Sequence, residues 1–168
     1  MALTIETGVG IATADSYISI TDANSYFTDR GSPSDWSGLN DAGKESALRY
    51  ATAYLDGIYK FVGEVTTTSQ SLAWPREGAF DEEGRNLEAN VIPQRVKDAT
   101  CELALLHTTT PLNKSYARGG AIERQKVGPI ETSYFSSARS DTWLPIVGQI
   151  IRGLATPRTG VSFDIERN

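Results

Sequence analysis

The segment DAGKESALRYATAYLDGIY, residues 41–59, carries the clearest structural signal in the chain. Its apolar side chains recur at spacings of three, four and seven residues, at Ala47, Leu48, Ala51, Tyr54, Leu55 and Ile58. This spacing places them on one face of an α-helix, while charged residues such as Glu45, Arg49 and Asp56 lie mostly on the other side. The segment therefore predicts an amphipathic helix whose apolar face packs against a core.

Three more helices are expected around it. Residues 22–30 follow Thr21, a good N-cap residue, and precede Gly31, which favours a helix end. A longer helix opens at Pro93 and ends before Pro111. Its heptad-like seam consists of Val96, Ala99, Leu103 and Leu106. We expect a mainly α fold, a small bundle of three to four helices.

The last helix is predicted at about residues 145–154. Ile146, Ile150 and Leu154 stack at four-residue spacing, and Val147 and Ile151 flank them. Its apolar content is so high that other parts of the protein must cover it.

The remaining segments read as loops and extended chain. Residues 1–20 are expected to form an extended N-terminal arm, 61–92 a long non-helical connection, and 155–168 a flexible C-terminal tail. Residues 121–136 flank Gly128-Pro129 and predict a projecting β-hairpin. The helical domain would then span residues 21–154 and include the hairpin.

Composition excludes several functional classes. The chain has 168 residues, a net charge of −5, one Cys and one His. A single Cys rules out an internal disulfide and a Cys-based zinc site, and a single His rules out a multi-His metal site. The acidic balance argues against a dedicated duplex-DNA binder. The sequence also predicts no membrane span and no signal peptide.

No set of residues predicts catalysis, a metal site or a cofactor. Cys101 lies within a predicted helix, where it is expected to be inert. His107 lies near a helix C-terminus, which favours its protonated form, and is expected to cap or pack. The acidic turn at residues 81–86 lacks the glycine spacing of a calcium loop. We therefore expect a protein without enzymatic activity.

The tripeptide Trp74-Pro75-Arg76 is the most distinctive short motif. We expect Trp74 to hold the long loop onto the core and Arg76 to pair with a carboxylate. The alternative is an anchor between subunits.

Charge is distributed unevenly along the chain. Residues 1–100 carry a net charge of −7, whereas residues 101–168 carry +2. The second part holds a diffuse basic set of Lys114, Arg118, Arg124, Lys126, Arg139, Arg152 and Arg158, with Tyr116, Tyr134, Phe135 and Trp143 between them. Basic residues beside aromatic ones suit single-stranded nucleic acid. They also suit a protein–protein interface, which the interspersed acidic residues favour.

Four stretches of the sequence resemble a known family. They are ADSYISITDANSYF at 14–27, LAWPR at 72–76, VIPQRVKDATCELA at 91–104 and VGPIE at 127–131. Together they resemble the DnaT-like family of tailed-phage proteins. That family carries a single-stranded-DNA-binding label, and its members look like head–tail connector adaptors. The resemblance covers most of residues 14–150.

The resemblance implies a structural virion protein at the head–tail junction, assembled in the host cytoplasm. Copies would form a ring, twelve-fold to match the portal, around the DNA channel. The implied partners are the portal protein, other neck and tail proteins, and genomic DNA that passes without sequence-specific binding. The alternative is a single-stranded-DNA-binding replication protein that depends on Arg124 and Tyr134.

Partner contacts are expected at a small set of residues. The alternating tail residues Val161, Phe163 and Ile165 suit strand addition to a partner. The full set of expected contacts is Trp74, Arg76, Tyr134, Phe135, Ile150, Ile151, Val161, Phe163 and Ile165.

Overall fold

The computed structural model describes residues 2–112, 124–127, 130–133 and 145–158. The chain forms two compact units. The helical unit comprises residues 1–112 and 145–168, and the hairpin unit comprises residues 113–144. The described residues contain five helices and three two-stranded sheets, so the expected mainly α fold is confirmed.

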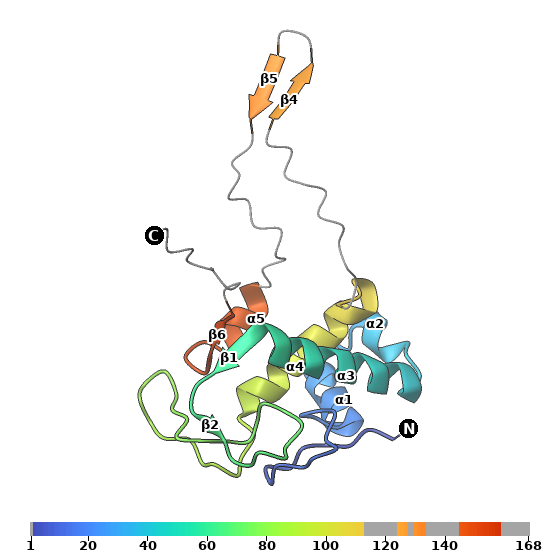
Figure 1. The fold of residues 1–168 in the computed structure, drawn as a ribbon. Helices are drawn as coiled ribbons and strands as arrows, with labels where there is room; N and C mark the ends of the chain where they lie inside the picture. The colour runs from blue at the N-terminus through green and yellow to red at the C-terminus, as the bar shows by residue number, and fades with distance from the viewer. Residues whose placement is uncertain (1, 113–123, 128–129, 134–144, 159–168) are drawn as a thin grey trace, which may run out of the picture. The chain divides into compact units, whose positions relative to one another are not determined.

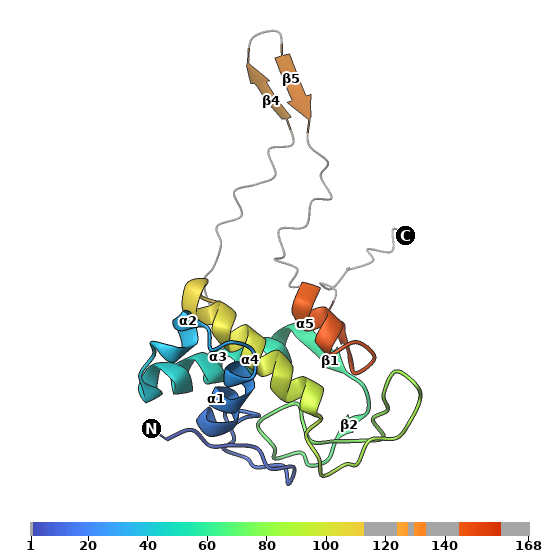
Figure 2. The same cartoon turned by 180° about the vertical axis from the view of Figure 1, so that it is seen from behind.

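Helices α3 (Asp41–Ile58) and α4 (Gln94–Thr109) form the centre of the helical unit. Asn40 caps α3 by accepting a hydrogen bond from the Gly43 backbone at 2.8 Å. Leu48 and Leu55 of α3 are fully buried, as is Leu103 of α4. In Figure 1, α3 lies in front of α4. Figure 2 shows the opposite side, where α4 lies in front of α3. Both helices were expected from the sequence.

The buried face of α3 differs in part from the predicted one. Ile58 is 42% exposed and Tyr54 is half-buried, whereas Thr52 is fully buried. Near the C-terminal end of α3, the buried face therefore includes Thr52 and leaves Ile58 out.

Helix α1 (Ile20–Thr28) begins earlier than predicted, and the predicted cap Thr21 lies inside it. The N-cap is Ser19, whose hydroxyl accepts a hydrogen bond from the Asp22 backbone and donates one to the Asp22 carboxylate. The next helix, α2 (Ser34–Ser37), is a single turn that carries Trp36. The rings of Trp36 and Phe27 lie 4.8 Å apart in the core.

Helix α5 (Pro145–Ile150) is shorter than the predicted helix 145–154. A turn follows it, and in that turn Gly153 has a φ of +80°, a conformation that favours glycine. The buried residues are Val147, Ile151 and Leu154, whereas Ile146 of the predicted stripe is 52% exposed. From Pro145 to Ile151, every residue except Gly148 and Gln149 is apolar. Sequence spacing alone could therefore not select the buried face of this helix.

Three residues of the predicted C-terminal tail form a strand. β6 (Ala155–Pro157) pairs antiparallel with β1 (Tyr59–Phe61), with Phe61 opposite Ala155. This pairing ties the end of the helical unit to the chain that leaves α3.

The connection 61–92 contains no helix, as predicted. Its short strands β2 (Glu64–Val65) and β3 (Arg76–Glu77) pair antiparallel. A further bridge joins Phe80 to Asn86 around the acidic turn. There, Asp81 accepts hydrogen bonds from its own backbone neighbours and pairs with Arg85 at 2.7 Å.

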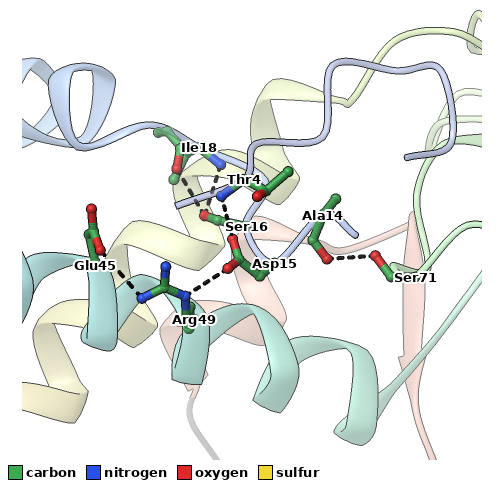
Figure 3. Close-up of polar contacts among 8 residues, drawn as sticks. All are labelled: Thr4, Ala14, Asp15, Ser16, Ile18, Glu45, Arg49 and Ser71. Atoms are coloured by element: carbon green, nitrogen blue, oxygen red, sulfur yellow. Dashed lines mark hydrogen bonds and ion pairs between the residues drawn. The ribbon is translucent and has the colours of Figure 1, made fainter. Parts of the chain in front are cut away.

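The N-terminal segment is fastened to the helical unit by polar contacts, which Figure 3 shows. Asp15 accepts a hydrogen bond from the Thr4 backbone at 2.8 Å and pairs with Arg49 of α3 at 2.7 Å. Arg49 also pairs with Glu45, and the Ser71 hydroxyl donates to the Ala14 carbonyl oxygen. The segment predicted as an extended arm forms only one isolated bridge, between Ile5 and Ser16.

Glu6 organises the turn within this segment. Its carboxylate is 2% exposed and accepts hydrogen bonds from the backbone N–H groups of Gly8, Val9, Gly10 and Ile11. A Cβ at Gly8 would lie 1.9 Å from the Asn90 carbonyl oxygen, so only glycine fits at this close approach.

The hairpin unit contains β4 (Arg124–Val127) and β5 (Ile130–Ser133). They pair antiparallel, with Arg124 opposite Ser133 and Lys126 opposite Glu131. The predicted antiparallel pairing of the two segments that flank Gly128-Pro129 is therefore confirmed.

Candidate nucleic-acid interface

Trp74 is part of the core of the helical unit. It is fully buried, and its ring meets the ring of Phe61 edge-on at 5.9 Å. Its backbone N–H donates to the hydroxyl of Tyr17 at 3.2 Å, and the Trp74-Pro75 peptide bond is cis. The expected role of holding the loop onto the core agrees with this burial. Within this chain, Trp74 presents no surface for an inter-subunit anchor.

Arg76 binds backbone carbonyls. Its guanidinium donates to the carbonyl oxygens of Val62 at 2.7 Å and Ala73 at 3.0 Å, and also to that of Gly63. The expected carboxylate partner is therefore wrong: the carbonyls of the turn after β1 lie nearer and fit the planar fork of donors. Burial lowers the pKa of Arg76. Arg76 therefore links the backbone that follows β1 to the backbone that precedes β3.

Tyr17 and Asp56 form a polar centre next to Trp74, which sequence patterns did not indicate. The Tyr17 hydroxyl lies 2.6 Å and 2.8 Å from the two carboxylate oxygens of Asp56, and Asp56 accepts a hydrogen bond from the Ala73 backbone at 2.8 Å. Burial is the main cause that raises the pKa of Asp56 and that of Tyr17. Asp56 was expected on the outer side of its helix. It instead joins α3 to the long connection.

The other expected contact residues fall into two groups. Ile150 is half-buried, and Ile151 is fully buried within its own chain. The remaining five lie outside the described residues, and their partner contacts stay predictions: Tyr134, Phe135, Val161, Phe163 and Ile165.

His107 and Tyr50 form a stacked pair on the surface of the helical unit. Their ring centroids are 4.5 Å apart, with an angle of 23° between the planes. His107 Nδ1 accepts a hydrogen bond from the Leu112 backbone at 2.9 Å, so this nitrogen carries no proton. Burial lowers the pKa of His107, which contradicts the expected protonated form. Desolvation here exceeds the effect of the helix C-terminus.

Cys101 is fully buried in α4. Burial is the main cause that raises the pKa of its thiol, and the nearby Asp98 and Glu102 add to the increase. The thiol is therefore protonated at neutral pH and is not a nucleophile.

A polar cleft of about 510 Å³ lies between α1 and α4. Arg30 and Lys97 line it together with Asp22, Asp29 and Asp98. Arg30 lies over the ring of Tyr26, 3.6 Å from its centroid. Three carboxylates beside two cations make this cleft unsuitable for a phosphate backbone.

The basic and aromatic residues concentrate in the hairpin unit. Its 32 residues include five basic and three acidic side chains, a net charge of +2. Since the whole chain carries −5, the helical unit carries −7. The sequence of the hairpin unit also contains Tyr116, Tyr134, Phe135 and Trp143. Arg124 and Lys126 occupy alternate positions of β4, and alternate positions share one face of a strand.

Two further features are absent from residues 2–112, 124–127, 130–133 and 145–158. No three His, Cys, Asp or Glu side chains of this part lie together as metal ligands. None of its helices combines the length and the apolar character needed to cross a membrane.

A family model described as "Putative DnaT-like ssDNA binding protein" matches residues 1–168. No curated protein and no solved structure matches the chain. The family match agrees with the family resemblance seen in the sequence, and it gives no support to a head–tail connector role.

Proposed function

The chain belongs to the DnaT-like ssDNA-binding family, and from this premise we propose that it binds single-stranded DNA through the hairpin unit. Binding is directed to the sugar-phosphate backbone and to unpaired bases, without sequence preference. No enzymatic step is part of the proposed function.

The separation of charge between the two units carries this proposal. A polyanion is repelled by the helical unit, with its net charge of −7, and attracted by the hairpin unit, with +2. The acidic composition of the whole chain argued against a dedicated duplex-DNA binder, but that average hides a basic segment. This basic segment corresponds to residues 113–144, one of the two compact units of the chain.

The chemistry of the hairpin unit suits unpaired strands. Proteins that bind single-stranded DNA combine cations that follow the phosphates with aromatic rings that stack on bases. Arg124 and Lys126 provide two cations at alternate positions of one ribbon, and four aromatic residues occur in the same unit. Glu131, opposite Lys126, limits the attraction and favours weak binding.

Fluorescence anisotropy with a labelled oligothymidylate tests this proposal. We expect saturable binding at low salt, with an affinity that falls as salt rises. Arg124→Ala with Lys126→Ala should weaken binding and reduce the salt slope by about 1.4, from about 0.7 for each phosphate contact in a single strand.

A matched control separates the ribbon from net charge. Lys60→Ala with Arg95→Ala removes the same charge from exposed positions of the helical unit. We expect this variant to keep the wild-type salt slope. An absence of binding at low salt refutes the proposal, and equal losses in the two double variants refute the assignment to the ribbon.

A head–tail adaptor that binds the portal protein and forms a ring is a second proposal. The acidic helical unit favours it, because a negatively charged wall lets DNA slide past. Native mass spectrometry of the chain with a portal protein tests it: a monomer that ignores the portal refutes the adaptor.

A further inference from the structure

The outer face of α3 is uncharged. It comprises Ser46, Tyr50, Ala53, Tyr54 and Gly57, which recur at helical spacing on the side opposite the buried Leu48 and Leu55. Ala53 and Gly57 are exposed, and Tyr50 is 41% exposed. No carboxylate interrupts this face, although the helical unit as a whole carries −7. It is thus a surface of this unit where a phosphate chain meets little repulsion.

Tyr50 is held in place on this face. Its ring stacks on His107 at 4.5 Å, and the Leu112 backbone N–H fixes the orientation of the imidazole at 2.9 Å. Stacking on His107 uses one face of the Tyr50 ring, and Tyr50 is still 41% exposed to a further planar group. Since the ring is already ordered, a planar ligand loses less conformational freedom of the protein on binding.

We propose that Tyr50, backed by His107, is a stacking platform for an unpaired base of single-stranded DNA. This inference rests on the proposed function and adds a base contact on the helical unit to the contacts of the hairpin unit. The hairpin unit begins directly after Leu112, the residue that holds His107, and its first cation is Lys114. The platform is therefore close in sequence to the first of these basic residues.

The composition of this face favours a base over a second copy of the chain. Its large exposed side chains are few, Tyr50 and the neighbouring Ile58. A stable interface needs about 800 Å² from each partner with a well-packed apolar centre. An exposed and ordered aromatic ring is instead the kind of side chain on which unpaired bases stack. His107 is uncharged at neutral pH, because burial lowers its pKa, and so the platform does not depend on a charge.

Three variants of the 168-residue chain test the platform by anisotropy with oligothymidylate. Tyr50→Ala should weaken binding about tenfold with an unchanged salt slope, because a stacking contact releases no counterions. Tyr50→Phe keeps the ring and should bind within about twofold of the wild type. His107→Ala should give an intermediate loss, since Tyr50 then lacks its support. Thermal unfolding of each variant checks that the helical unit remains folded.

A second measurement identifies the contact directly. An oligothymidylate that carries 5-iodouracil should crosslink to Tyr50 on irradiation, whereas the same sequence as a duplex should not, because its bases are paired. Equal affinities of Tyr50→Ala and wild type refute the platform while the proposed function stands. A wild-type chain that binds no DNA refutes the proposed function itself. A dimer that dissociates in Tyr50→Ala, seen by sedimentation, refutes the platform in favour of an interface between copies.

Discussion

Removing the hydroxyl of Tyr17 should destabilise the helical unit strongly. In Tyr17→Phe the ring remains in the core, but two hydrogen bonds are lost. One is the donation to Asp56 at 2.6 Å, and the other is the acceptance of the Trp74 backbone N–H at 3.2 Å. Tyr17 is 0% exposed, so water does not replace the missing partner.

The magnitude follows from what is left unpaired. A hydrogen bond to a charged carboxylate contributes about 2 kcal/mol, and an orphaned buried amide costs about 1 kcal/mol. The expected loss is about 3 kcal/mol in the free energy of unfolding. For a chain of this size, that corresponds to a decrease of about 6–12 °C in the melting temperature.

Urea unfolding followed by tryptophan fluorescence measures this loss, because Trp74 is buried beside the altered group. Tyr50→Phe is the matched control: it removes the same hydroxyl from an exposed position, and we expect a change below about 0.5 kcal/mol. The pKa of Asp56 should rise further in Tyr17→Phe, because the Tyr17 hydrogen bond favours the ionised form. A destabilisation equal to that of the control would refute the role of this polar centre.

Three further outcomes are expected. The pKa of His107 is lowered, so its neutral form stabilises the fold above pH 6.5, and this contribution to the free energy of unfolding should be lost as pH falls below that value. Urea unfolding at several pH values should show this dependence on pH in the wild type but not in His107→Gln. Arg76→Met should lower the free energy of unfolding by about 3 kcal/mol, since three carbonyl oxygens lose their donor, and thermal unfolding measures the decrease. Glu6→Gln should cost about 1–2 kcal/mol because the amide nitrogen cannot accept from the Ile11 backbone, and hydrogen exchange of residues 8–11 should accelerate.

Local sequence signals predicted the elements that depend on neighbouring residues. Helix α3 was found from its spacing, α4 from its seam between two prolines, and the hairpin from the segments around Gly128-Pro129. Where two local signals competed, the prediction slipped. Thr21 was chosen as the cap of α1, yet the N-cap is Ser19. Ser19 accepts a hydrogen bond from the Asp22 backbone and donates one to the Asp22 carboxylate.

Contacts between distant segments could not be predicted in the same way. The pairing of β6 with β1 joins residues nearly a hundred positions apart, and three-residue strands carry almost no periodic signal. Asp56 sits beside the charged face of its helix, so only the folded connection shows that Tyr17 and Ala73 reach it. Arg76 was recognised as important, but its partners are carbonyls, which every residue possesses and no pattern singles out.

The polar groups of the helical unit also indicate where its function does not lie. Glu6, Asp15, Asp56 and Arg76 all bind partners within the chain. Asp15 and Asp56 fasten loops to α3, whereas Glu6 and Arg76 hold turns within the loops. Groups engaged in this way are poor ligand sites, because a ligand would have to replace contacts that hold the fold together. Among the described residues, the 41% exposed ring of Tyr50 is one feature open to a partner. By its sequence, the basic hairpin unit is another. Binding of single-stranded DNA is the proposed function that uses both.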